Sequence, residues 1–215
     1  MNRMQAAWLV GRPGFGALVK LFAPLRVYGR ERIPANGPLV LCFNHFSWLD
    51  PWALGSVVPR TVYYVAKQEL HDNPIVGPFV RFFGTFSVRR GESDREAIRI
   101  MRDVVHRGDT LGMFPEGTRQ EREPGRVLPG AAMIAVQEAA PVVCGAIHGS
   151  QDWRFGNFHP VSIAFGEPLD VTGHPRNSRG YRAASEQIQR ELRRLFDFLV
   201  LTHEQGRPRV ATPPS

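Results

Sequence analysis

The chain has 215 residues, of which 43% are hydrophobic, so it is long enough to bury one sizeable core and is expected to form a single domain. Its formal net charge of +7 favours anionic partners such as lipid headgroups and phosphorylated substrates. Nucleic acid is not an expected partner, because the sequence has neither a basic run with interleaved aromatic residues nor a zinc-finger spacing.

The cysteines and the first residues bear on the cellular compartment. Cys42 and Cys144 both lie within apolar runs, which predicts buried, reduced thiols and a reducing compartment. No secretory signal is expected, because the first apolar stretch is cut early by a Gly-Arg-Pro sequence. The next apolar stretch, 14–25, is too short to span a bilayer. Residues 1–26 are therefore expected to be an amphipathic segment that lies in a membrane interface or packs on the domain.

Apolar runs alternate with helical periodicities along the rest of the chain. The run Leu39–Phe43 predicts a buried strand, and Asp50-Pro51 predicts the start of a helix with Asp50 as its N-cap. Further strands are expected at 61–66, 85–88, 110–114, 141–147 and 161–165, and further helices at 74–83, 93–107, 129–139 and 184–199. This alternation predicts an α/β fold with helices flanking a mostly parallel central sheet. Residues 205–215 are expected to be a disordered tail.

His45 and Asp50 directly follow the first buried strand, in the segment Asn-His-Phe-Ser-Trp-Leu-Asp. On one regular helix their side chains would lie about 140° apart, but a loop that turns into a helix lets them converge. Asp50 then accepts a hydrogen bond from one imidazole nitrogen and leaves the other to take a proton from a hydroxyl. The alternative is a plain helix cap beside a loop histidine. Ser47 is too close to His45 to be its nucleophile, and no further ligands complete a metal site.

The segment Phe-Pro-Glu-Gly-Thr-Arg at 114–119 ends a predicted strand in a tight turn. Arg119 offers a planar guanidinium suited to a phosphate group. Glu116 is expected to hold a substrate hydroxyl or Arg119 itself. A solvated Glu116–Arg119 pair, worth about 0–1 kcal/mol to stability, is the alternative.

A third segment combines positive charge with apolar residues. Lys67, Arg89 and Arg90 flank an apolar stretch that includes Phe79 and Phe82. A cationic cluster beside an apolar groove suits an amphiphile with an acyl tail and a phosphate head. The same aromatic residues are also compatible with a plain hydrophobic core.

Taken together, residues 27–170 resemble the 1-acylglycerol-3-phosphate O-acyltransferase family of glycerolipid acyltransferases. The segment 44–50 is similar to the family's NHxSxxD block, and 114–119 is identical to its FPEGTR block. The segment 67–91 resembles the family's phosphate-binding block, and the one from 141 resembles its Pro-containing strand on the acyl-donor side. The resemblance implies one acyltransferase domain over residues 27–204, with a fold like that of the glycerol-3-phosphate acyltransferases.

Members of this family move a fatty acyl group from a coenzyme A or acyl-carrier-protein thioester to a glycerol-phosphate hydroxyl. The resemblance implies that His45 is the general base, oriented by Asp50, and that attack is direct, without an acyl-enzyme. It implies no bound cofactor and no metal, with the acyl thioester as a co-substrate. The expected phosphate- and glycerol-binding residues are Lys67, Arg90, Glu116, Gly117, Thr118 and Arg119, and those on the acyl-chain and donor side are Phe79, Phe82, Pro141 and Val142.

Two departures from the family pattern leave the acceptor open. Arg89 replaces the usual acidic residue, and no lysine precedes Pro129-Gly130. Lysophosphatidate is the expected acceptor, which would make phosphatidate, and a lyso-ornithine lipid or a glycolipid is the alternative. A peripheral position on the cytoplasmic face of the cell membrane is expected. A basic lipid-binding protein without catalysis is the alternative from another class, and such a protein would have no need of a base at His45.

Overall fold

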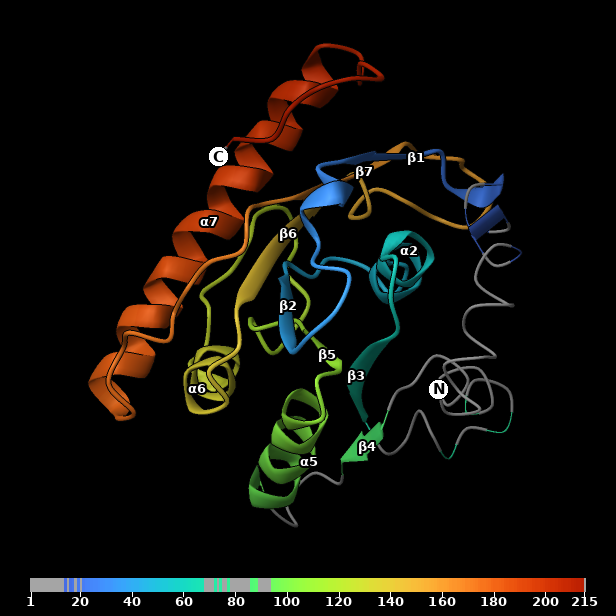
Figure 1. The fold of residues 1–215 in the computed structure, drawn as a ribbon. Coiled ribbons are helices and arrows are strands. Elements are labelled where there is room, and N and C mark those ends of the chain that lie inside the picture. Colours follow the sequence, from blue (N-terminus) through green and yellow to red (C-terminus); the bar gives the residue numbers. More distant parts are fainter. Residues whose placement is uncertain are drawn as a thin grey trace.

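The computed structural model describes residues 21–67, 86–88 and 94–214, together with Gly14, Gly16, Ala17, Val19, Asp72, Pro74 and Gly77. These residues contain a seven-stranded sheet of order β1-β7-β6-β2-β5-β3-β4 (Figure 1). The strands are β1 (Leu25–Tyr28), β2 (Leu39–Phe43), β3 (Val62–Lys67), β4 (Phe86–Val88), β5 (Thr110–Met113), β6 (Val142–His148) and β7 (Val161–Phe165). The helices are the 3-10 helix η1 (Arg30–Arg32) and the α-helices α2 (Asp50–Val57), α5 (Asp94–His106), α6 (Gly130–Gln137) and α7 (Ser178–Glu204).

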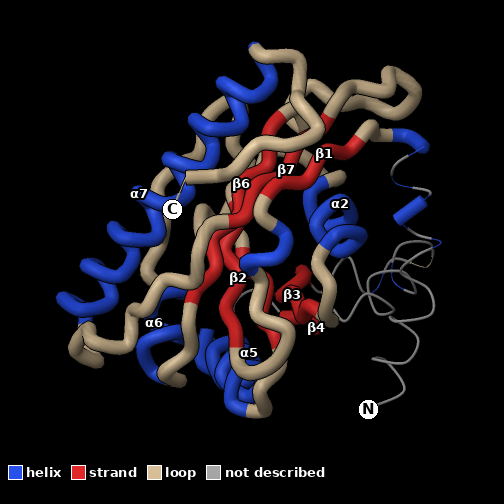
Figure 2. The backbone as a smooth tube through the Cα atoms, turned by 45° about the horizontal axis from the view of Figure 1, so that its top comes forward, coloured by secondary structure: helices blue, strands red, loops and turns tan. Residues whose placement is uncertain are grey.

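Helices cover both faces of the sheet, which confirms the predicted α/β fold. Helices α5, α6 and α7 lie on one face and α2 lies on the other (Figures 1 and 2). Strand β2 is in the middle of the sheet and every one of its residues is buried. Burial on both faces is the reason that its sequence is a continuous apolar run. Among the residues that the structure describes, no helix is both long enough and apolar enough to cross a membrane.

The sheet is parallel except at one side. The pairs formed among β2, β3, β4, β5 and β6 are all parallel, whereas β7 is antiparallel to β6, and β1 is parallel to β7. The connection from β6 to β7, residues 149–160, contains no helix. A parallel partner would need a longer crossover connection, usually a helix, so this short loop returns the chain in the antiparallel direction.

Most predicted elements are present, with ends that differ by one or two residues. Helix α7 is longer than the predicted 184–199, because it begins at Ser178, where the side chain of Asn177 accepts a hydrogen bond from Gly180 N (3.0 Å). Strand β1 was not predicted, since its four residues include only one that is fully buried. The helix expected at 74–83 and most of the segment 1–26 lie outside the described residues.

Residues 205–214 depart from the disordered tail that we expected. They contain no helix or strand, but they lie against β1 and η1. The Tyr28 hydroxyl donates a hydrogen bond to Pro208 O (2.9 Å), and the Arg32 guanidinium donates one to Pro213 O (2.9 Å). The tail is held through its backbone carbonyls, and every residue has one whatever its side chain. Its position therefore leaves no apolar periodicity in the sequence from which it could have been predicted.

Candidate active site

The site forms where the chain leaves the sheet at the end of β2. Asn44 follows the last residue of β2, and its side chain makes two hydrogen bonds with the backbone of Ile147 in β6, at 2.8 and 2.9 Å. This buried amide fixes the direction in which the chain turns, and therefore the position of His45. Sequence reasoning gave no role to Asn44. The available signal was a polar residue directly after an entirely apolar strand.

His45 and Asp50 converge as predicted. The distance from His45 Nδ1 to Asp50 Oδ2 is 2.8 Å, and the same oxygen accepts hydrogen bonds from Phe46 N (2.7 Å) and Ser47 N (2.8 Å). The prediction that Asp50 is the N-cap was wrong: the N-cap is Leu49, and Asp50 is the first residue of α2. Its side chain turns back to bind the loop that carries His45, so this carboxylate holds both the backbone and the ring.

The His45 ring is held on its face as well as at its edge. Phe114 stacks on it with ring centroids 4.2 Å apart, and Tyr64 stacks on Phe114 with ring centroids 6.0 Å apart. The side chain of His45 is 19% exposed, whereas that of Asp50 is fully buried. Within the described part of the chain, Nε2 of His45 makes no hydrogen bond. A ring fixed through Nδ1 with an open Nε2 is the arrangement that a general base requires.

Glu116 joins the two sequence blocks through the backbone. Its Oε2 accepts a hydrogen bond from His45 N (3.0 Å), and its Oε1 accepts one from Gly125 N (2.8 Å). A second hydrogen bond joins the same two segments, since His45 O accepts one from Gln120 N (2.7 Å). Burial raises the pKa of Glu116, while the two backbone hydrogen bonds act in the opposite direction. The expected Glu116–Arg119 pair is not found among the described residues.

The rest of the turn is open to solvent. Gly117, Thr118 and Arg119 are exposed, and Gly117 has a φ of +73°, in the left-handed region that glycine tolerates best. In the portion of the chain that the structure describes, the Arg119 guanidinium makes neither a hydrogen bond nor an ion pair. The next residue, Gln120, donates its N–H to His45 O (2.7 Å), so this exposed cation belongs to a turn that contacts the loop of His45 and is available to an anionic ligand there.

The structure does not bring all the predicted residues together. Lys67 ends β3 at the same edge of the sheet as His45, since β3 is parallel to β5 and β5 to β2. Its side chain lies outside the described residues, as do Arg90, Phe79 and Phe82. Pro141 and Val142 are at the opposite edge: Val142 is fully buried and pairs with Val40 near the start of β2. The prediction that these two residues line the acyl-donor side of the site was therefore wrong.

Metal binding finds no support in the side chains present. Over 21–67 and 94–214, and at the few described residues between, no three His, Cys, Asp or Glu side chains form a group that could hold an ion.

Comparison with known proteins identifies the family of this chain. A family model described as Acyltransferase matches residues 24–148, more than half of the chain. The chain belongs to the acyltransferase family. This membership confirms the resemblance seen in the sequence and identifies an enzyme, in preference to a lipid-binding protein without catalysis.

Individual relatives extend over most of this acyltransferase. The 1-acyl-sn-glycerol-3-phosphate acyltransferase of Bacillus subtilis is 28% identical, over 85% of this chain and 93% of that protein. The lyso-ornithine lipid O-acyltransferase of Brucella abortus is also 28% identical, over 94% of this chain and 88% of that protein. The crystal structure of the 1-acyl-sn-glycerophosphate acyltransferase of Thermotoga maritima superposes with a TM-score of 0.68 at 24% identity, covering 89% of this chain and 83% of that one. The fold is therefore shared with a lysophosphatidate acyltransferase.

Proposed function

We propose that this acyltransferase moves a fatty acyl group from an acyl thioester to the free hydroxyl of 1-acyl-sn-glycerol 3-phosphate, which makes phosphatidate in phospholipid biosynthesis. The observation that carries the proposal is the His45–Asp50 hydrogen bond of 2.8 Å, which leaves Nε2 without a partner among the described residues. The exposed Arg119 directly precedes Gln120, whose N–H donates to His45 O (2.7 Å). Relatives named 1-acyl-sn-glycerol-3-phosphate acyltransferase support this choice of acceptor.

His45 has two proton transfers to perform in this reaction. Its Nε2 accepts the proton of the acceptor hydroxyl as that oxygen attacks the thioester carbonyl carbon. Asp50 stabilises the imidazolium that results. When the tetrahedral intermediate collapses, the carbon–sulfur bond breaks and the departing thiolate takes the proton from His45. The products are an ester and a free thiol, and no covalent intermediate on the enzyme is required.

Arg119 is the described residue best placed to hold the acceptor. A phosphate accepts two parallel hydrogen bonds from a guanidinium, which positions the glycerol hydroxyl relative to the base. We expect Arg119→Ala to raise KM for lysophosphatidate and to change kcat much less. Lys67 and Arg90 remain predicted partners of the same phosphate, and either coenzyme A or acyl-carrier protein remains the predicted carrier of the acyl donor.

The deciding experiment is free-thiol release from oleoyl-coenzyme A, with and without lysophosphatidate, by wild type and His45→Ala. Release that requires both the acceptor and His45 supports acyl transfer with His45 as the base. Release without acceptor indicates a thioesterase and contradicts the proposal. If wild type is inactive, the same assay is repeated with an acyl-carrier-protein thioester before the acceptor is changed.

A lyso-ornithine lipid is the second candidate acceptor, because a relative that covers 94% of this chain carries that name. The two acceptors are separated by competition, in which each is offered at equal concentration with limiting thioester and the labelled products are resolved by chromatography. Since Arg119 is expected to bind a phosphate, Arg119→Ala should weaken the binding of lysophosphatidate more than the binding of the phosphate-free lipid. We further propose that the enzyme works as a peripheral protein on the cytoplasmic face of the cell membrane, where such acceptors reside.

A further inference from the structure

We propose that the loop 149–160, between β6 and β7, is a membrane-docking surface that places Phe155 and Phe158 in the interface of an anionic bilayer. The proposal rests on the proposed function, because an acceptor embedded in a bilayer has to reach His45 from the membrane side. It names the surface through which that approach occurs.

Two aromatic side chains of this loop are turned to solvent. Phe155 is 74% exposed and Phe158 is 53% exposed, three residues apart in one loop. Large apolar side chains that gather on a surface mark interaction sites, because leaving them in water forgoes their burial free energy. Phe158 also has a φ of +50°, a left-handed conformation that is unfavourable for a residue with a β-carbon. Backbone conformations of this kind cluster at functional sites.

The loop is held in shape by its own polar residues. Oδ1 of Asn157 accepts hydrogen bonds from Arg154 N (3.1 Å) and His159 N (3.0 Å), and its Nδ2 donates to Asp152 O (2.9 Å). The Asp152 carboxylate in turn pairs with Arg122 at 2.9 Å. A loop already ordered in the free protein loses little conformational entropy when it docks.

A row of aromatic rings connects the loop to the active site. Phe155 stacks on Phe22 with centroids 5.1 Å apart, and Trp153 Nε1 donates to Phe22 O (3.0 Å). Trp153 meets Trp48 edge to face at 5.2 Å. Trp48 is 56% exposed and lies three residues after His45. Figure 1 shows the loop beside the blue segment that contains Phe22, and the contact between Trp153 and Trp48 links the loop to the segment that carries His45.

Charge favours a bilayer over a second copy of the chain. Arg154 is exposed next to Phe155, and its guanidinium is fixed in the loop by a hydrogen bond to Gln151 O (2.9 Å). Aromatic rings with an adjacent cation suit the headgroup level of a membrane that contains anionic lipid. Two copies of a chain with a net charge of +7 repel one another, whereas an anionic bilayer attracts each of them.

The test is partitioning onto vesicles of equal parts phosphatidylcholine and phosphatidylglycerol, followed by cosedimentation. We expect Phe155→Ala and Phe158→Ala each to lower the partition coefficient roughly tenfold, and the double variant roughly 100-fold. Leu201→Ala is the matched control, since Leu201 is an apolar side chain of α7 that is 56% exposed, and it should bind as wild type does. Wild-type binding by the double variant would overturn the proposal, as would a changed oligomeric state with unchanged binding.

Two further measurements separate this surface from the catalytic proposal. The double variant should keep its kcat/KM for a short-chain lysophosphatidate dispersed as monomers, and lose activity only toward acceptor in vesicles. If wild type acylates no lysophosphatidate, the proposed function fails while the partitioning still decides the surface. A polarity-sensitive dye on Phe155→Cys provides a direct readout, because Cys42 and Cys144 are buried. Its emission should shift to the blue when vesicles are added, and no shift would contradict docking through this loop.

Discussion

At the scale of single residues, one carboxylate oxygen of Asp50 holds both the ring of His45 and the backbone of the loop after it. It accepts hydrogen bonds from His45 Nδ1, Phe46 N and Ser47 N, while Oδ1 is buried with no hydrogen-bond partner among the described residues. Asp50→Asn removes the charge that stabilises the imidazolium and places an amide donor in that buried position. We expect kcat to fall by about 10²- to 10⁴-fold and the free energy of unfolding by about 1–3 kcal/mol. Steady-state kinetics and urea titration measure the two effects, and an unchanged kcat would contradict the role of Asp50.

Glu116 acts through backbone atoms, which predicts a different pattern of loss. Glu116→Gln has one acceptor oxygen for two N–H groups, so its amide must face either His45 N or Gly125 N. We expect the free energy of unfolding to fall by about 1–3 kcal/mol. We also expect kcat to fall roughly tenfold or more because His45 shifts, with KM nearly unchanged. Arg119→Ala, from the same turn, serves as the comparison, with its effect mainly on KM. A raised KM with unaltered stability in Glu116→Gln would instead indicate direct contact with the acceptor.

The pairing of His45 with Asp50 could be predicted because both of its determinants are local. An apolar strand ends just before His45, and Asp50-Pro51 begins a helix, so the residues between them have to turn. The partners of Glu116 could not be predicted in this way. A carboxylate can accept from any backbone N–H, and only the conformations of two loops decide that those of His45 and Gly125 are the ones within reach.

At the scale of the elements, β2 and β6 meet through a glycine. A β-carbon on Gly145 would lie 2.1 Å from Cε1 of Phe43, a fully buried ring that packs edge to face on Phe165. Gly145→Ala therefore forces Phe43 from its place, and we expect it to lower the free energy of unfolding by about 1–3 kcal/mol. Gly173→Ala is the matched control, since nothing lies within 4 Å of its β-carbon, and its effect should stay within about 0.5 kcal/mol. Equal unfolding midpoints for the two variants would contradict the prediction and show that Phe43 can shift without a cost in stability.

The elements that the sequence predicts well are those whose burial is uniform. Strand β7 has the predicted bounds, since every residue in it is buried and the run is apolar apart from Ser162. Strand β1 has three half-buried residues at the edge of the sheet, and no period or run distinguishes it from a loop. The antiparallel direction of β7 also had no local signal, because it follows from the length and structure of the connection 149–160.

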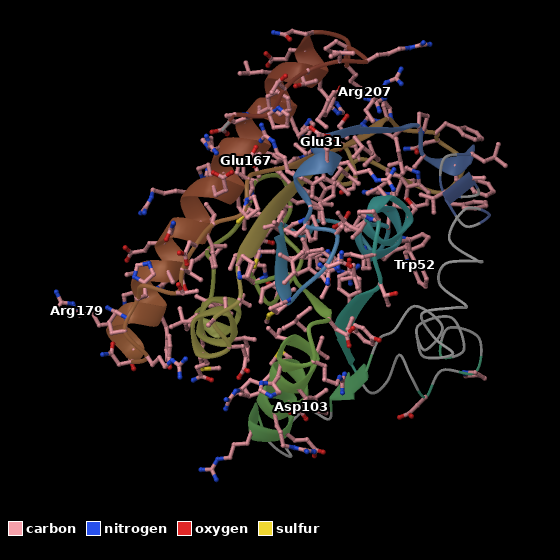
Figure 3. The ribbon with its side chains drawn as sticks, in the orientation of Figure 1. Glu31, Trp52, Asp103, Glu167, Arg179 and Arg207 are labelled. Atoms are coloured by element: carbon pink, nitrogen blue, oxygen red, sulfur yellow. The ribbon has the colours of Figure 1, made fainter. Side chains whose placement is uncertain are left out.

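At the scale of the whole molecule, a polar cluster joins β6, β7, α7 and the tail. His203 Nε2 lies 2.8 Å from Ser162 Oγ, which also accepts a hydrogen bond from Arg207 Nε (3.1 Å), and the rings of His203 and His148 meet edge to face at 4.5 Å. Arg207 is labelled in Figure 3 near the end of α7. Burial, and then the nearby charges of His148, Arg207 and His159, lower the pKa of His203 from 6.5 to about 4.

This lowered pKa makes the stability of the fold depend on pH. Between pH 6.5 and about 4 the unfolded chain binds a proton at His203 that the folded chain does not, so the free energy of unfolding falls as the pH falls. The stabilisation is complete above pH 6.5, and we expect about 1–2 kcal/mol to be lost across this range, since solvent screens the half-buried ring. His203→Gln keeps an acceptor and a donor near Ser162 but cannot titrate, so its stability should decline less over the same interval. Urea titrations of both proteins along this pH series decide the point, and parallel declines would exclude His203 as the source.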